Sequence, residues 1–229
     1  MHGIAVWGAN LSAAHVTRLD TGAGRRQHDV VHHEGRLAEA DVTEVEGVLV
    51  TMPARAVVEA TGQLSVEAAV VSADSALHLG LTDPAELRRT HDAMQTWPFT
   101  RRTHAVLAFS DGRAESPGES RSRLMFRAHG VPAPILQFPV YDDRGVLIGI
   151  TDFAWPDHRV LGEFDGRVKY GRLLLPGQEP GDVVFAEKQR EDRLREVTDM
   201  RMFRMTWSDL YRGAETTARL RRALQRPAA

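Results

Sequence analysis

The sequence predicts an α+β protein in two parts, and three observations predict it. Short β-like and helical patterns alternate along the 229 residues, which is typical of sheets with helices packed on their faces. The stretch Ser110–Gly118 is rich in turn-forming residues. Residues 1–110 hold nine Arg against 13 Asp and Glu, a balance of -4, whereas residues 111–229 carry +2. We therefore predict a smaller α+β domain over residues 1–110 and an α/β domain over residues 111–229.

In the first part, the β-like segments come before the helices. Glycine-containing turns separate three short strand patterns, at Ala14–Leu19, His28–His33 and Val48–Met52. Helical patterns then cover Ala54–Ala60 and Ser65–Leu79. A third helix is expected to begin after Asp83, because Asp83 can cap it, Pro84 suits the first helical position and Glu86 can reach back. That helix extends to about Gln95.

The second part has the order helix, three strands, helix, strand, helix. Its predicted elements are a helix over Glu119–His129, strands over Ile135–Tyr141, Val146–Trp155 and Arg159–Asp165, a helix over Asp182–Glu196, a strand over Met200–Thr206 and a helix over Ser208–Leu224. Gly130 and Pro132 end the first of these helices. This order predicts a mixed sheet flanked by helices.

Composition excludes several classes of protein. The chain has no cysteine, so disulfides and thiolate metal sites are excluded, and its formal charge of -2 argues against a uniformly basic surface. The N-terminal stretch lacks a basic region, Asn10 interrupts its apolar run, and no run is long enough to cross a membrane, so we expect a cytoplasmic protein without membrane contact. Only Lys169 and Lys188 are lysine among 29 basic residues, which singles out both positions. Lys188 lies in a run of alternating charges that is typical of a solvated helix face.

A cluster of carboxylates is predicted where the second and third strands of the second part pair. If the two strands are joined at Asp157 and His158, the register sets Asp152 across from Glu163. Strand alternation then brings Asp165 to the same face as Glu163, while Phe153, Trp155 and Phe164 point into the core.

Acids so close together cannot all stay ionised unaided, and a divalent cation would resolve their repulsion. The alternatives are a solvated acidic face, or a register shifted by one residue. Lys169 follows closely and could orient an attacking water or stabilise charge on a phosphate. Glu119 could add a further acid from the preceding helix. The alternative for Lys169 is an ordinary surface lysine, and the alternative for Glu119 is an acid that the helix dipole favours in the first turn.

Four separated segments resemble the PD-(D/E)XK nuclease domain. They are Glu115–Arg121, Thr151–Phe153, Glu163–Tyr170 and Arg190–Leu194, and they occur in the family's order over residues 113–212. The similarity is greatest to actinobacterial proteins related to very-short-patch repair endonucleases. The resemblance implies a restriction-endonuclease-like core, with Asp152 and Glu163 as metal-binding acids and Glu119 as the helical acid.

The sequence departs from the family signature at one position. The family has lysine two residues after the second acid, where this chain has Asp165. In the repair-endonuclease-like branch a compensating polar residue follows the Asp-Gly pair, and Lys169 occupies that place. The segment Val50–Glu59 is similar to the central region of AbiEi-type antitoxin-like proteins, which usually begin with a winged helix-turn-helix; here we expect the chain to open after that module.

These observations lead to one main hypothesis and two alternatives. The main hypothesis is a nuclease that hydrolyses DNA phosphodiester bonds with Mg²⁺ or Mn²⁺ as cofactor: Asp152, Glu163 and Asp165 bind the metal, and Lys169 and Glu119 assist. The first alternative is a catalytically degenerate nuclease fold that serves as an antitoxin-like or nucleic-acid-binding regulator. The second is a protein-interaction module that recruits a partner through residues 1–110. Formation of a homodimer stays open.

Overall fold

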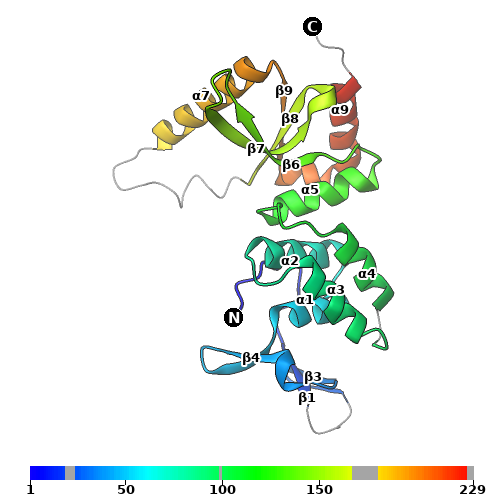
Figure 1. Ribbon diagram of the computed structural model, residues 1–229. Coiled ribbons are helices and arrows are strands. Elements are labelled where there is room, and N and C mark those ends of the chain that lie inside the picture. Colours follow the sequence, from blue (N-terminus) through cyan, green and yellow to red (C-terminus); the bar gives the residue numbers. More distant parts are fainter. Residues whose placement is uncertain (19–23, 98–99, 167–179, 226–229) are drawn as a thin grey trace. The chain divides into compact units, whose positions relative to one another are not determined.

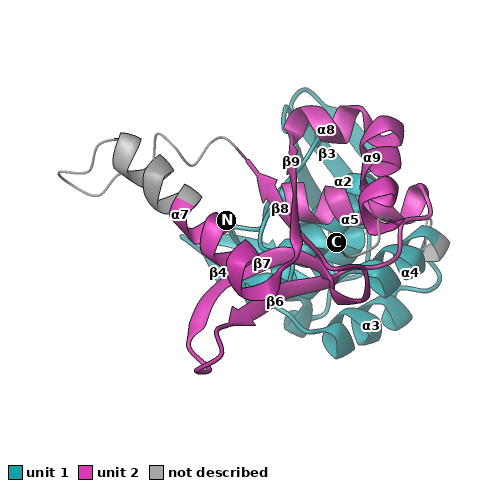
Figure 2. Ribbon diagram, turned by 90° about the horizontal axis from the view of Figure 1, so that it is seen from above, with its two compact units in different colours: residues 1–117 teal, residues 118–229 magenta. Residues whose placement is uncertain are grey.

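The chain divides into two compact units, residues 1–117 and 118–229, which are coloured separately in Figure 2. The structure is a computed structural model that describes residues 1–18, 24–97, 100–166 and 180–225, with the backbone alone for residues 100, 101 and 180–188. Both units combine helices and strands, which confirms the predicted α+β class (Figure 1).

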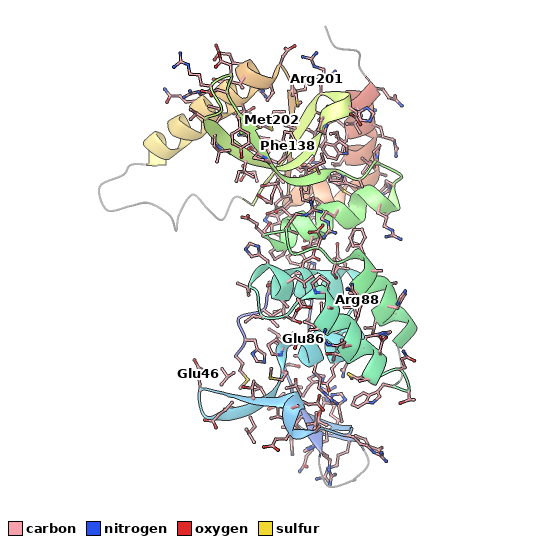
Figure 3. All side chains as sticks on the ribbon, in the orientation of Figure 1. Glu46, Glu86, Arg88, Phe138, Arg201 and Met202 are labelled. Carbon is pink, nitrogen blue, oxygen red and sulfur yellow. The ribbon has the colours of Figure 1, made fainter. Side chains whose placement is uncertain are left out.

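Unit 1 opens with two small sheets. The first has the order β1-β3-β2 and consists of β1 (Ala14–Arg18), β2 (Arg25–Gln27) and β3 (Val30–Glu34), with β1 and β3 parallel. After a 3₁₀ turn at Glu39–Asp41, β4 (Val42–Val45) and β5 (Val48–Thr51) form a hairpin. Glu46 and Gly47 both have positive φ, 52° and 79°, as a two-residue hairpin turn requires. The exposed tip of this hairpin carries Glu46, labelled in Figure 3.

Four helices follow in unit 1: α1 (Pro53–Thr61), α2 (Val66–His78), α3 (Pro84–Ala93) and α4 (Thr100–Phe109). The predicted Asp83 cap of α3 is present, because its carboxylate accepts from the N–H groups of Ala85 and Glu86 at 2.7 and 2.8 Å, and Pro84 opens the helix. The Glu86 carboxylate reaches back to the hydroxyl of Thr82, at 2.8 Å, instead of to the backbone of Asp83. The helices bury aliphatic side chains against one another, including Val57, Val70, Val71, Leu87 and Val106. This unit therefore has its own core.

The segment that leaves unit 1 is bound to α2. The backbone N–H of Asp111 donates to the fully buried carboxylate of Asp74 at 2.8 Å, and the ring of His78 contacts the carbonyl of Gly112. Ala114 is buried as well. These contacts explain why the division lies between Pro117 and Gly118, whereas the turn-rich sequence placed it after Ser110.

Unit 2 is built on one mixed four-stranded sheet. Its strands β6 (Ile135–Tyr141), β7 (Leu147–Trp155), β8 (Val160–Asp165) and β9 (Arg201–Thr206) lie in the order β6-β7-β8-β9. The first three are antiparallel neighbours, and β9 runs parallel to β8. Among the described residues of this unit, the helices are α5 (Pro117–Ala128), α7 (Pro180–Thr198), α8 (Trp207–Tyr211) and α9 (Gly213–Gln225). The predicted mixed sheet flanked by helices is thereby confirmed.

Each face of this sheet buries a different cluster. On one face, α5 and α9 cover the larger cluster, which includes Phe126, Phe153, Trp155, Phe203 and Leu220. On the other face, Leu194 of α7 packs with Val140, Ala154 and Leu161, and the partly buried Phe138 and Met202 flank them (Figure 3). Figure 1 shows α7 and α9 on opposite sides of the sheet. The second face carries the predicted acids.

Candidate functional site

The register between β7 and β8 brings the two principal acids together. Trp155 pairs with Val160 and Phe153 with Gly162, which is the predicted register, and one step further Asp152 lies across from Glu163. The connection is a 3₁₀ turn at Pro156–His158, after which Arg159 adopts a left-handed φ of 53°. The tight turn therefore keeps the two carboxylates on facing positions of neighbouring strands.

Strand alternation turns the acids away from the large aromatic cluster. Phe153, Trp155 and Phe164 all belong to that cluster, which confirms the prediction that they point into the core. Asp152 and Glu163 alternate with them and so lie on the face that α7 covers. Glu163 is only 8% exposed, so this face is not the solvated acidic surface that we considered as an alternative.

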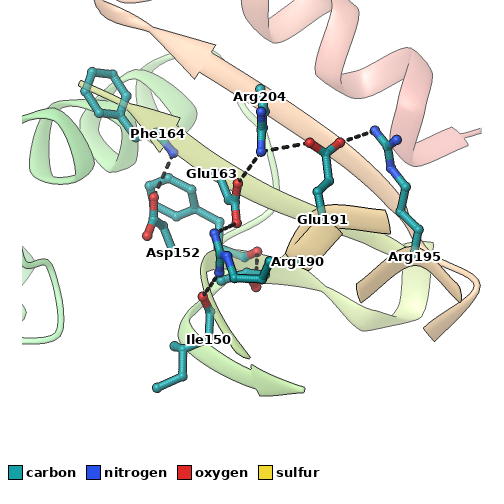
Figure 4. A network of polar contacts seen from close by, with 10 residues as sticks. Ile150, Asp152, Glu163, Phe164, Arg190, Glu191, Arg195 and Arg204 are labelled. Atoms are coloured by element: carbon teal, nitrogen blue, oxygen red, sulfur yellow. Dashed lines mark hydrogen bonds and ion pairs between the residues drawn. The ribbon is translucent and has the colours of Figure 1, made fainter. Parts of the chain in front are cut away.

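Asp152 is fixed by the strand that it faces. Its Oδ2 accepts a hydrogen bond from the backbone N–H of Phe164 at 2.7 Å (Figure 4). The ladder between β7 and β8 ends at Phe153 and Gly162, so this contact replaces the next step of backbone pairing with a side-chain bond. It holds the carboxylate beside β8 at the point where the strands cease to pair.

Glu163 is the centre of an ion-pair network. Its Oε1 accepts from Arg190 of α7 at 2.8 Å, and its Oε2 accepts from Arg204 of β9 at 3.3 Å (Figure 4). Arg204 also pairs with Glu191 at 2.7 Å, and Glu191 in turn pairs with Arg195 one helical turn further on. The network thus joins three guanidinium groups to two carboxylates, which leaves one positive charge in excess.

Burial is uneven within this network. The side chains of Glu163 and Glu191 are 11% and 12% exposed, whereas those of Arg190 and Arg204 are 33% and 37% exposed. Water reaches the guanidinium groups and screens the ion pairs. Each ion pair therefore contributes about 1 kcal/mol to stability, and not the several kcal/mol at stake in a fully buried pair. The arginines therefore both neutralise the buried acids and present cationic edges to the solvent.

Helix α5 approaches β8 closely at the same end of the sheet. A Cβ built on Gly118 would lie 2.0 Å from Cε1 of Phe164, so only glycine allows this distance between helix and strand. The next residue, Glu119, is buried and accepts from the amide of Gln137 on β6 at 3.1 Å. Arg121 lies over the rings of Trp207 and Tyr211, at 5.7 and 5.4 Å from their centroids.

The junction of β9 and α8 is fixed by a buried carboxylate. Asp209 accepts from the N–H and the hydroxyl of Thr206, both at 2.9 Å, and pairs with Arg219 at 2.9 Å. Burial alone would raise the pKa of Asp209, but these hydrogen bonds and the arginine outweigh it and lower that pKa. Because Thr206 is the register partner of Asp165, this cap also holds the end of β9 beside the acids.

The other predicted site residues do not join Asp152 and Glu163 in one ligand group. Asp165 ends β8 on the face of Glu163, and Glu119 is engaged with Gln137. Within the part of the chain that the structure describes, no group of three or more His, Asp or Glu side chains is placed to hold a metal ion. The structure thus brings Asp152 and Glu163 together as a facing pair, and a metal site with Asp165 as a third ligand stays a prediction. Lys169 lies outside the described residues, as does the side chain of Lys188.

Arg190 and Arg204 are the residues of this candidate site that sequence reasoning missed. The charged helix around Arg190 was interpreted as a solvated face, yet Arg190 reaches an acid 27 positions away. A signal for Arg204 was present, because it lies between two residues that enter the core, Phe203 and Met205. Alternation thus assigns Arg204 to the face of the acids once β9 is known to lie beside β8.

A divalent cation fits the donor types of this site. Two carboxylates from adjacent strands, completed by water, are ligands that Mg²⁺ accepts, and Asp152 and Glu163 would supply them. In the described arrangement both oxygens of Glu163 instead accept from guanidinium groups. A cation at Glu163 would therefore compete with these two arginines for the same carboxylate.

Comparisons with known proteins give relatives without an assigned activity. Two curated proteins from two strains of Mycobacterium tuberculosis, each named as uncharacterized, are 35% identical to this chain over 126 residues. The match covers 55% of this chain and 46% of the relatives, so the chain spans about half the length of the proteins it matches. No family model and no solved structure matches the chain. Among the described residues, no helix is long and apolar enough to span a membrane.

Proposed function

We propose that unit 2 is a metal-dependent phosphodiesterase that cleaves DNA in the cytoplasm. The single observation that carries the proposal is the facing pair of Asp152 and Glu163, held on neighbouring strands beneath α7. The ordered resemblance to PD-(D/E)XK nucleases assigns metal binding to the same two acids. Mg²⁺ or Mn²⁺ would supply charge neutralisation at the phosphoryl group when bound.

The protein's own groups have distinct tasks in this proposal. Asp152, fixed by the Phe164 N–H, and Glu163 are the residues that would hold the ion. The partly exposed guanidinium groups of Arg190 and Arg204 bind the phosphate backbone, which positions DNA without reading its sequence. Lys169, outside the described residues, is proposed to position the attacking water or stabilise charge on the phosphate. Asp165 and Glu119 are proposed as accessory acids.

The test is DNA cleavage by matched variants. Supercoiled plasmid and single-stranded DNA are incubated with the protein and Mg²⁺ or Mn²⁺, and the products are resolved on gels. Asp152→Asn keeps an oxygen that can accept from Phe164 and should lose cleavage, because it removes the charge that holds the ion. Asp157→Ala, in the exposed turn of the same hairpin, is the control and should cleave like wild type. Equal cleavage by Asp152→Asn and wild type would refute the proposal.

A second candidate is favoured by the pairing of Glu163 with two arginines. A carboxylate neutralised in this way serves a structural purpose without metal, as a degenerate nuclease fold that binds nucleic acid or acts as an antitoxin-like regulator would require. Calorimetry with Mn²⁺ distinguishes the two candidates. Binding that is lost in Glu163→Gln supports the phosphodiesterase, and DNA binding without Mn²⁺ binding supports the regulator.

Partners other than DNA are proposals for unit 1 and for the whole chain. A protein partner recruited through residues 1–110 is tested by pull-down with the full chain and with a variant that carries substitutions on the exposed hairpin tip, at Glu46 and Leu49. A homodimer is tested by sedimentation of the full chain. If no protein is captured by the full chain or by the variant, the protein partner is excluded. If the full chain sediments with the mass of a monomer, the homodimer is excluded.

A further inference from the structure

Both oxygens of the Glu163 carboxylate are engaged by arginine. Arg190 Nη2 lies 2.8 Å from Oε1 and Arg204 Nη2 lies 3.3 Å from Oε2. The Glu163 side chain is 11% exposed, so a cation has little room beside both guanidinium groups. A metal ion that binds Glu163 therefore has to compete with Arg190 and Arg204, and these two arginines are held in different ways.

Arg204 is the more firmly placed of the two arginines. It is the register partner of Glu163 on β9, so the sheet itself holds them side by side. Its guanidinium is shared with Glu191, at 2.7 Å, which keeps it in place even when Glu163 turns away. Opposite charges at such facing strand positions are an ordinary source of sheet stability.

Arg190 is attached differently. It reaches Glu163 from α7 across the backbone of β7, where its Nη1 donates to the carbonyl of Ile150 at 3.3 Å. A Cβ built on Gly149 would lie 3.4 Å from this Nη1, an ordinary contact, which shows that the guanidinium packs beside β7. Its exposure of 33% is similar to the 37% of Arg204, but Arg190 comes from a helix, so it can turn toward solvent without moving a strand.

We propose that Arg190 closes the metal site of the free protein and that a DNA phosphate opens it. This inference rests on the proposed phosphodiesterase function. A phosphate offers the guanidinium the same planar pair of acceptors as a carboxylate, so the backbone of bound DNA competes with Glu163 for Arg190. Released from Arg190, Glu163 has Oε1 available for a cation next to Asp152. Metal and DNA therefore bind cooperatively, each raising the affinity for the other by the same factor.

The first experiment measures Mn²⁺ binding to the full chain by calorimetry, without DNA. Arg190→Gln removes the charge of a partly exposed side chain and leaves the sheet and the pair of Glu163 with Arg204 in place, so the fold should be retained. This variant should bind Mn²⁺ about tenfold more tightly than wild type, within the range usual for coupled ligands. Arg193→Ala is the matched control: Arg193 lies on the same helix, is 61% exposed and lies near Asp142 instead of Glu163, so its Mn²⁺ affinity should equal that of wild type.

The second experiment repeats the titration with a short phosphorothioate duplex that resists hydrolysis. The duplex attracts Mn²⁺ by its own charge, so the compared quantity is the factor by which the duplex raises the Mn²⁺ affinity of each protein. Wild type and Arg193→Ala should show the same increase, and Arg190→Gln should show about a tenfold smaller one, because its site is already open.

The outcomes separate this inference from the proposed function. If Arg190→Gln and wild type bind Mn²⁺ equally well, and Glu163→Gln loses binding, the closing role of Arg190 is wrong while the metal site stands. If Arg190→Gln binds no Mn²⁺, although its Glu163 is released, both proposals fail. If Arg193→Ala changes the affinity as much as Arg190→Gln, the effect is one of general charge and the inference is again overturned.

Discussion

Replacing Gly118 by alanine tests how closely α5 must approach β8. The added Cβ would lie 2.0, 2.3 and 2.5 Å from three ring atoms of Phe164, whereas real Cβ contacts are essentially never shorter than 3.0 Å. The ring would have to move by at least about 1 Å, yet it is 8% exposed and lies edge-on against Trp207 at 4.9 Å. A buried ring in such a position cannot retreat without disturbing its neighbours.

The magnitude follows from two opposed effects. Alanine is favoured over glycine by up to about 1 kcal/mol inside a helix, and by less in the first turn, where Gly118 lies. Overpacking a filled core costs about 1–3 kcal/mol. The packing term is the larger, so Gly118→Ala should lower the free energy of unfolding of unit 2 by about 1–2 kcal/mol. Local helix preference alone predicts the opposite sign.

Urea titration monitored by hydrogen–deuterium exchange of peptides from β8 and α5 measures this free energy for unit 2 separately from unit 1. Gly166→Ala is the matched control, because the nearest atom to its added Cβ is Nε1 of Trp207 at 4.0 Å, an ordinary contact. It should leave the stability unchanged or raise it slightly. A Gly118→Ala variant as stable as the control would show that the close approach of α5 and β8 is not tightly packed.

Three further predictions concern single side chains. Asp209→Asn should destabilise unit 2 by about 1–2 kcal/mol, because it loses the cap and the pair with Arg219. The pKa of Asp209 is lowered in the folded protein, so the stability that its carboxylate contributes is present above pH 3.8 and is lost as the pH falls through the lowered pKa. Urea titrations in acid should therefore give wild type and variant the same free energy of unfolding. Burial, with the nearby His15, lowers the pKa of His33, so the stability that neutral His33 contributes to the β1–β3 pair is present above pH 6.5 and is lost as the pH falls through the lowered pKa. Amide exchange of β1 and β3 should show this pH dependence, and His33→Gln should remove it. Phe153→Ala should cost about 3–5 kcal/mol in urea unfolding, because its fully buried ring packs at the centre of the larger cluster, and a cost below 1 kcal/mol would contradict that placement.

Most of the fold of unit 2 was predictable because its elements are marked locally. The bounds Ile135–Tyr141 of β6 were predicted as observed, since Pro132 and the turn at Asp142–Gly145 delimit the strand. The final helix was predicted as continuous, but it is interrupted at Arg212, where α8 ends before α9 begins at Gly213. The sequence cannot show that Asp209 turns back to cap its own helix at Thr206 and pairs forward with Arg219.

The elements missed in unit 1 are those without a clear pattern. Strand β2 (Arg25–Gln27) is three exposed polar residues, held only by pairing with β3. Strand β4 (Val42–Val45) is four residues long and depends on its hairpin partner. Helix α4 (Thr100–Phe109) begins with five polar residues, so its apolar periodicity is weak. In each case the neighbouring element, and not the local sequence, decides the conformation.

The candidate site was predictable only as far as one hairpin reaches. The facing positions of Asp152 and Glu163 follow from the length of the turn between their strands, which is a local property. The pairing of Glu163 with Arg190 and Arg204 joins residues 27 and 41 positions apart, and it depends on how α7 and β9 pack on the sheet. Charge alternation along α7 is the same whether its arginines face water or a buried acid.

The contacts between residues 111–114 and α2 decide how the protein is best divided into fragments. A fragment that ends at Ser110 loses the N–H that Asp111 donates to the buried Asp74 carboxylate, and it uncovers the surface under Ala114. A fragment that ends at Pro117 keeps both. A fragment of unit 1 that is expressed alone should therefore include the turn-rich stretch, although the composition of that stretch suggests a dispensable linker.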